Sequence, residues 1–386
     1  MSLSRFKQSG RHLWVGILAI IATSSILLWA DRNSRLSAIA EAQNNERLPH
    51  IAIVQHASID PLDDGVRALQ AALKQRGFGA DVGATYTLYN AQGDFATANT
   101  IAKTVISDNL DLIMTVSTLS MQTVASANRL LTEPKKHLFG ITTDPFGAGI
   151  GVSRERPLDH PPYLAGVGSN SPIRELFQMI KRIKPELKRI GLVWNPAEAN
   201  SEASTVLARA VVKELDMELV EGNAENSSAA GEVAKALISR GVDVLWLSTD
   251  VTTTTARDVM IKAARQAGIP VISSLPSSAD SGALIALGSS YYDVGFEQGQ
   301  MAADILEGRD MATIPVINWT PVALRLNLTA LEGLRSPWII PQDVQDRAEV
   351  IFDANGMRKQ DVPAPAVPEA LKWQKQTPPP ARTDDT

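Results

Sequence analysis

Short polar side chains gather at a few turns of the 386-residue chain, directly after runs of aliphatic and β-branched residues. Hydroxyl and amide groups beside exposed helix amides suit an anionic group such as a carboxylate. Asp250, Asp144 or Glu198 suits an ammonium group. These residue types predict a site for a small zwitterion. The predicted ligand-binding residues are Gln55, His56, Ser58, Ser117, Thr118, Thr143, Asp144, Asn195, Glu198, Ser201, Thr249, Asp250 and Ser274.

Each of these turns also has a simpler interpretation, which is helix capping. Ser, Thr, Asp and Asn cap helices at strand-to-helix turns throughout this structural class. The binding interpretation rests on their recurrence in both halves of the chain, because a cleft between two lobes would turn them toward each other.

Composition excludes several other kinds of chemistry. The net charge of -5 argues against nucleic acid as a partner, since phosphate binding needs a basic surface. The absence of cysteine excludes disulfides, thiolate metal sites and a catalytic thiol. The five histidines are not spaced as a metal pair, and the sequence has neither a Walker A motif nor a G-x-S-x-G elbow. We therefore expect a protein that is not an enzyme and has no cofactor and no metal.

The elements needed to position the polar turns follow from hydrophobic periodicity. Short β-branched runs alternate with amphipathic segments from His50 onward, a pattern typical of parallel sheets covered by helices. Strands are expected at 51–55, 81–87, 112–116, 138–141, 189–194, 218–221, 242–247, 270–273, 283–287, 315–317 and 322–328. Helices are expected at 60–76, 94–107, 120–131, 173–184, 201–215, 229–240, 254–267, 291–306 and 342–352.

Two series of similar length and order make up this pattern, and the last elements are too few for a third domain. We therefore predict an α/β fold with two Rossmann-like, doubly wound lobes joined by crossover hinge strands. The predicted N-terminal lobe comprises 49–166 plus 290–318, the C-terminal lobe 167–289 plus 319–352, and a disordered Pro-rich tail 353–386.

The N-terminal residues form a segment separate from the α/β pattern. Arg5, Lys7 and Arg11 precede an apolar run at 13–30, the order that directs export with the basic end inside. Eighteen residues give roughly 27 Å of helix, close to the bilayer core. We expect 1–30 to be an N-terminal hydrophobic helix, either an uncleaved signal anchor in the membrane or a cleaved signal peptide. Residues 31–48 would follow as a tether, which indicates a periplasmic or other extracytoplasmic location.

Four segments carry a family resemblance. Residues 90–94 (Asn-Ala-Gln-Gly-Asp), 194–201, 248–250 and 282–295 resemble ABC-transporter substrate-binding proteins of the tryptophan-binding type, in one order between Leu48 and Phe352. The resemblance implies a type I periplasmic-binding fold with three crossover strands and a ligand clamped between lobes.

The resemblance also implies partners. Proteins of this type bind aromatic and related amino acids and deliver them to an ABC permease in the inner membrane with its cytoplasmic ATPase. The alternative is a membrane-tethered sensor that signals to a partner protein. A permease gene beside this one would favour transport, and a kinase or cyclase gene would favour sensing.

Overall fold

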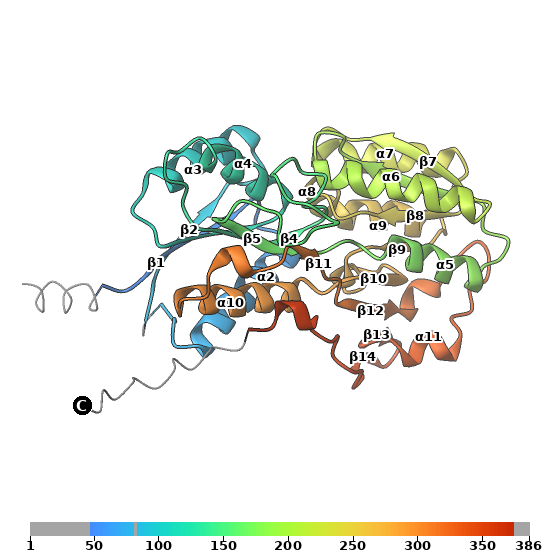
Figure 1. Ribbon diagram of the computed structural model, residues 1–386. Helices are drawn as coiled ribbons and strands as arrows, with labels where there is room; N and C mark the ends of the chain where they lie inside the picture. The colour runs from blue at the N-terminus through green and yellow to red at the C-terminus, as the bar shows by residue number, and fades with distance from the viewer. Residues whose placement is uncertain (1–46, 81–82, 374–386) are drawn as a thin grey trace, which may run out of the picture. The chain divides into compact units, whose positions relative to one another are not determined.

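Two β-sheets form the framework of the chain in a computed structural model, which describes residues 47–80 and 83–373 (Figure 1). The predicted N-terminal helix at 1–30 and most of the predicted tether lie outside these residues. Within the described ranges, no helix has the length and apolarity needed to cross a membrane.

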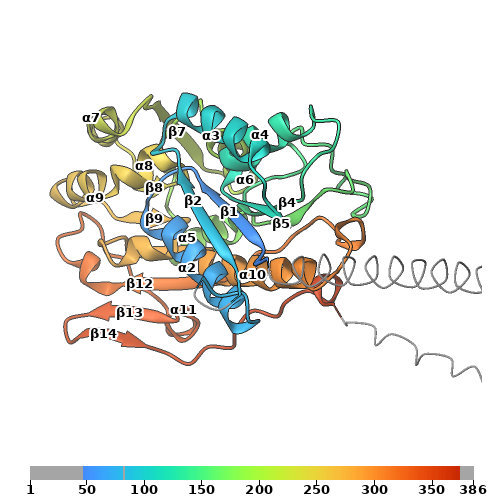
Figure 2. The same ribbon diagram turned by 90° about the vertical axis from the view of Figure 1, so that its left-hand side faces the viewer.

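The first sheet has six parallel strands in the order β11-β5-β4-β3-β1-β2. Helices α2 and α10 cover one face and α3 and α4 the other (Figures 1 and 2), so the central strands are buried on both sides. We call this sheet with its four helices the first lobe. Its bounds are β1 (His50–Gln55), α2 (Asp60–Gln75), β2 (Thr85–Asn90), α3 (Phe95–Ser107), β3 (Leu112–Val116), α4 (Thr118–Asn128), β4 (His137–Thr142), β5 (Leu164–Gly168), α10 (Tyr291–Leu306) and β11 (Ile317–Asn318).

The second sheet has eight strands in the order β14-β13-β12-β10-β9-β8-β6-β7, with antiparallel pairing only at β10–β12 and β13–β14. Helices α5 and α6 pack on one face, and α7 and α9 on the other. We call this the second lobe. Its bounds are α5 (Ile173–Ile183), β6 (Arg189–Trp194), α6 (Ala199–Glu214), β7 (Glu218–Asn223), α7 (Ser227–Ser239), β8 (Val244–Leu247), α8 (Val251–Thr255), α9 (Arg257–Gln266), β9 (Val271–Ser273), β10 (Ile285–Ser289), β12 (Val322–Asn327), α11 (Gln342–Asp346), β13 (Val350–Asp353) and β14 (Gly356–Lys359).

The chain passes between the two sheets after β5, after β10 and after β11. Hydrogen bonds join these passages to one another. The hydroxyls of Ser169 and Ser289 are bonded, the Ser290 N–H donates to the Pro321 carbonyl at 2.8 Å, and the Thr320 hydroxyl donates to the Asn170 carbonyl at 2.9 Å. The three crossings therefore form one bonded hinge region.

Glycines allow α10 to lie against α2 at backbone distance. A Cβ built on Gly295 would lie 2.2 Å from the Gly65 carbonyl oxygen, and one on Gly299 would lie 2.4 Å from the Leu69 carbonyl oxygen. Only glycine leaves room for such an approach. This contact attaches α10, which follows the second crossing, to the first lobe.

The structure differs from the sequence prediction in several elements. The helix expected at 342–352 ends at Asp346, and 350–353 form β13, because pairing with β12 and β14 favours a strand there. The helix expected at 254–267 is divided into α8 and α9 at Ala256. The strand expected at 81–87 corresponds to β2, which ends three residues later than predicted. The predicted lobe boundary at 166 falls within strand β5.

The predicted disordered tail is ordered up to the end of the described residues. Residues 356–359 form β14, and Leu371 is buried in the core under α2 and α10. The prediction of disorder was therefore wrong for 353–373. It rested on composition, which gives no information on the contacts with distant residues that order this segment.

Candidate functional site

A cavity of about 440 Å³ lies between the carboxyl ends of the strands of the two sheets. Both lobes contribute to its wall, which is the arrangement expected of a ligand site in doubly wound folds. From the first lobe it is lined by His56, Ile59, Pro61, Leu62, Gln92, Gly93, Phe95, Ser117, Thr118, Leu119, Ile141, Thr143 and Tyr291. From the second lobe it is lined by Asn195, Ala197, Glu198, Ala199, Asn200, Glu225, Asn226, Ser227, Thr249, Val251, Thr252, Thr255 and Leu275.

The structure brings seven of the thirteen predicted residues together in this wall. These seven follow strands β1, β3, β4, β6 and β8, whose carboxyl ends face the cavity. They are His56, Ser117, Thr118, Thr143, Asn195, Glu198 and Thr249.

Ser117 and Thr118 begin helix α4 at the cavity wall. Ser117 has a φ of 104°, a conformation that non-glycine residues rarely adopt, and its hydroxyl accepts a hydrogen bond from the Ser120 N–H. The Thr118 hydroxyl accepts from the Thr143 N–H at 3.2 Å, which joins this turn to the one after β4. The positive end of α4 therefore points toward the cavity, where an anionic group would be stabilised.

Glu198 lies on the opposite wall, where its carboxylate holds the start of helix α8. One oxygen accepts the N–H of Val251 at 2.8 Å, and the other accepts the N–H and the hydroxyl of Thr252 at 3.0 and 2.8 Å. The Asn195 amide donates to the same Thr252 hydroxyl. These bonds fix the position of a negative charge at the cavity surface and use part of its accepting capacity.

Asp250 and Ser201 do not line the cavity, contrary to the prediction. Asp250 is fully buried as the N-cap of α8, where it accepts the Thr253 N–H at 2.7 Å and the Ser201 hydroxyl at 3.1 Å. Burial, and next the charge of Glu198, raise the pKa of Asp250 to about 7. Asp250 therefore has the capping role, and Ser201, within α6, donates to it from beneath the wall.

Four further predicted residues also bond elsewhere. The Gln55 amide and the Ser58 hydroxyl both donate to Asp63 near the start of α2, away from the cavity wall. Asp144 pairs with Arg154 at 2.9 Å, and Ser274 accepts the indole N–H of Trp246. Of the three carboxylates suited to an ammonium, only Glu198 thus reaches the cavity.

His56 lines the cavity from the first lobe. It is buried at the end of β1, and burial lowers its pKa, against the opposing effects of Glu198 and Asp94. We therefore expect a neutral imidazole at neutral pH. Its Nδ1 atom is buried and has no hydrogen-bond partner within the described part of the chain.

Sequence reasoning missed the apolar part of the wall. Phe95, Leu62, Ile141, Leu275 and Tyr291 line the cavity. Phe95 is 61% exposed at the first position of α3, although exposure of a large apolar side chain is unfavourable without a partner. The sequence signal that could have identified Phe95 as a lining residue is an aromatic side chain directly after the helix cap Asp94.

The charge of the wall restricts the ligand. Glu198 and Glu225 are acidic, and none of the described lining residues is lysine or arginine. A multiply charged anion would meet net repulsion and no cationic partner. The cavity therefore favours a ligand that is neutral, zwitterionic or cationic.

Two α/β lobes with a ligand-sized cavity between the carboxyl ends of their strands define the class of two-lobed solute-binding proteins. The family model described as ABC transporter substrate binding protein matches residues 50–348. The chain belongs to this family, and its fold is that of the type I periplasmic-binding proteins, as the sequence predicted.

Individual relatives agree with this assignment. A protein of Clostridioides difficile named tyrosine-binding protein is 28% identical over 320 residues, covering 82% of this chain and 90% of the relative. The crystal structure of a conserved domain protein from Vibrio cholerae has a TM-score of 0.73 at 29% identity, covering 79% of this chain and 100% of its own. A domain from Streptococcus pneumoniae in complex with L-Trp has a TM-score of 0.72 at 22% identity, with coverage of 79% and 100%.

Proposed function

We propose that this chain is the extracytoplasmic ligand-binding subunit of an ABC importer, and that it binds an aromatic amino acid. The observation that carries the proposal is the cavity of about 440 Å³, to which both lobes contribute polar turns. The acidic wall, with no lining lysine or arginine among the described residues, supports a zwitterion over an anion. The relative named tyrosine-binding protein supports an aromatic side chain.

Three parts of the wall are assigned to three parts of the ligand. The ligand carboxylate binds at the start of α4, near Ser117 and Thr118, where helix amides and the helix dipole favour an anion. The ammonium group pairs with Glu198 on the opposite wall. The ring packs on Phe95, whose exposure is then relieved by the ligand.

The assignment gives a reason for closure. Carboxylate and ammonium are held by different lobes, so the ligand makes all its contacts only when the lobes approach each other. A ligand with higher affinity for one arrangement shifts the population toward it. We propose hinge closure about the three crossings, with the closed form recognised by a membrane permease that has a cytoplasmic ATPase.

Calorimetry tests the ligand. We expect L-Tyr or L-Trp to bind the full chain, and the D-enantiomers to bind at least about tenfold more weakly, because exchanging the α-substituents breaks one charge-assisted contact. Absence of heat with every aromatic amino acid would contradict the proposal.

Glu198→Gln tests the ammonium site. Loss of the negative charge, together with the replacement of one oxygen that accepts from α8 by an amide NH2, should weaken affinity by about tenfold or more. Glu225→Gln is the matched control, since Glu225 also lines the cavity but has no assigned ligand contact. Equal effects of the two changes would show that only the general negative field matters.

A further inference from the structure

The chain continues beyond the region that matches the family model. After β14 it leaves the second lobe and returns to the helices of the first lobe, over residues 360–373 (Figure 1). The family match ends at residue 348, so this return lies outside it. We call residues 360–373 the strap.

Gln360 anchors the beginning of the strap to the second lobe. Its N–H donates to the Glu349 carbonyl at 2.8 Å. Its side-chain amide donates to the carbonyls of Gln345 and Ala348, each at 2.7 Å. Gln345 lies in α11, and Ala348 and Glu349 lie between α11 and β13, so this end is fixed by the second lobe alone.

The other end of the strap is anchored to the first lobe. The indole N–H of Trp319 donates to the Ala366 carbonyl at 3.1 Å, and Leu371 is 1% exposed in the core beneath α2 and α10. Val367 packs on the same core. Trp319 itself follows β11 in the third crossing, so the strap is bonded to the hinge region.

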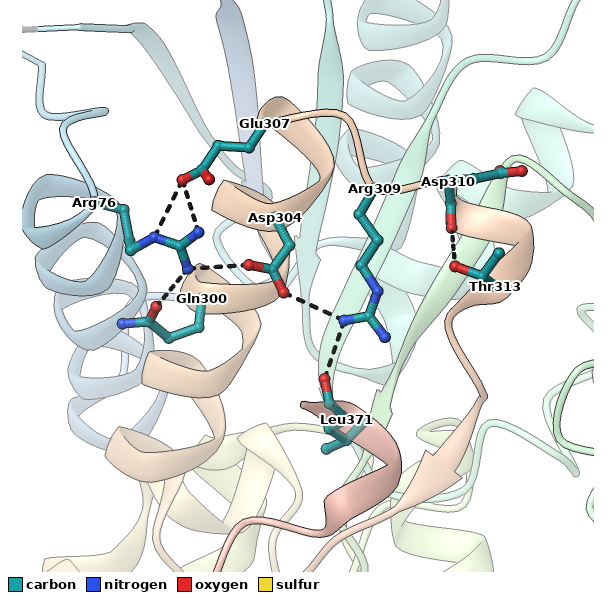
Figure 3. A network of polar contacts seen from close by, with 8 residues as sticks. All are labelled: Arg76, Gln300, Asp304, Glu307, Arg309, Asp310, Thr313 and Leu371. Atoms are coloured by element: carbon teal, nitrogen blue, oxygen red, sulfur yellow. Dashed lines mark hydrogen bonds and ion pairs between the residues drawn. The ribbon is translucent and has the colours of Figure 1, made fainter. Parts of the chain in front are cut away.

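An arginine cluster completes this anchor (Figure 3). The buried Arg309 guanidinium donates to the Leu371 carbonyl at 3.0 Å and pairs with Asp304 at 3.3 Å. The second oxygen of Asp304 binds Arg76, whose guanidinium also binds Glu307. Because Arg76 ends α2 and Asp304 belongs to α10, the strap is attached at the point where these two helices are joined.

A short spacer links the two anchors. Residues 361–365 have the sequence Asp-Val-Pro-Ala-Pro and form no helix or strand. Two prolines in five residues restrict the backbone and give the spacer an extended, semi-rigid character. Such a spacer has little slack, so a rotation that moves Gln360 away from Arg309 must break an anchor.

We propose that the strap is a fourth connection between the lobes that limits the amplitude of their hinge motion. The inference rests on the hinge motion proposed above, and its test uses no ligand. The strap restricts the ligand-free protein to arrangements near the one described here. It thereby lowers the fraction of widely open molecules that closure must recover.

The experiment lengthens the spacer while leaving both anchors in place. About six Gly and Ser residues inserted between Pro363 and Ala364 give a flexible chain in place of the semi-rigid one. Because the chain has no cysteine, spin labels can be attached at Lys103→Cys on α3 and Glu232→Cys on α7, one exposed position on each lobe. Pulsed electron paramagnetic resonance then gives the distribution of distances between the lobes.

We expect the lengthened strap to broaden the ligand-free distribution and add a longer-distance population. The matched control carries the same insertion between Thr132 and Glu133, in an exposed loop of the first lobe, and should retain the distribution of the unmodified chain. Leu371→Ser, which weakens the first-lobe anchor, should broaden it as well. A distribution unchanged by both strap variants would overturn the proposal, whereas failure of every amino acid to bind would affect only the proposed ligand.

Discussion

At the scale of single residues, Asp250 is the acidic residue near the site whose pKa is shifted most. Its folded-state pKa of about 7 lies above the value of an unfolded aspartate, about 3.9. The group therefore stabilises the fold most below the unfolded pKa, and this contribution is lost as the pH rises through about 7. Asp250→Asn keeps a neutral side chain throughout, so its stability relative to wild type should increase between about pH 5 and about pH 8, on the order of 2 kcal/mol.

Urea unfolding at the two pH values measures this difference. Asp94→Asn is the control, because Asp94 caps α3 in a similar way but its hydrogen bonds with Thr97 lower its pKa. Its stabilising effect is complete above the unfolded pKa and is lost only as the pH falls below that range. The Asp94 variant should therefore differ from wild type by the same amount at both pH values, and parallel behaviour of the Asp250 variant would contradict the buried, protonated carboxyl.

At the scale of elements, the contact of α10 with α2 decides which lobe holds the helix that follows the second crossing. Gly295→Ala places a Cβ at 2.2 Å from the Gly65 carbonyl oxygen, so the helices must move apart. We expect a loss of about 1–3 kcal/mol in the free energy of unfolding, the usual cost of overpacking. Chemical denaturation with circular dichroism measures it.

Gly231→Ala in α7 is the matched control for this change. A Cβ there would meet only the Val259 side chain, which is exposed and free to shift. The gain in helix propensity should make this variant neutral or up to about 1 kcal/mol more stable. Equal destabilisation by both changes would show that the close approach of α10 to α2 is not the cause of the loss.

Local sequence signals predicted most elements of both sheets, because buried parallel strands and amphipathic helices have strong periodic patterns. The same signals predicted the polar turns, and seven of thirteen residues there line the cavity. The sequence alone could not show that the other six predicted residues lie outside the cavity wall. The Asp250 carboxylate is held beneath the wall in part by the Ser201 hydroxyl, which lies 49 residues away in sequence.

The sequence predictions failed mainly where contacts with residues far away in the chain determine the structure. Residues 350–353 form a strand because β12 and β14 pair with it, and Leu371 is ordered because Arg309 and the first-lobe core receive it. Phe95 was missed for a related reason, because it lines a cavity that exists only with the second lobe on the opposite side. Composition and periodicity describe a segment alone and contain no information on such contacts.

At the scale of the whole molecule, one ion pair joins the two lobes beside the cavity. Arg257 at the start of α9 binds Asp60 at the start of α2, with an N–O distance of 3.2 Å. The arginine side chain is 14% exposed and that of Asp60 is 74% exposed. The pair is possible only while these helices lie close together, so it stabilises the arrangement of lobes described here relative to a more open one.

Arg257→Ala should therefore weaken ligand affinity although it touches no assigned ligand group. Exposed pairs contribute up to about 1 kcal/mol, so we expect a two- to fivefold effect, roughly, measured by calorimetry with the amino acid that binds wild type. Raising salt from about 50 to about 500 mM should reduce the difference, because screening acts on the pair in wild type alone. The exchange of both residues, Asp60→Arg with Arg257→Asp, should restore part of the affinity if charge attraction between the lobes is the cause. If the double exchange binds more weakly than Arg257→Ala at low salt, Arg257 acts by packing within the second lobe and the ion pair does not stabilise closure.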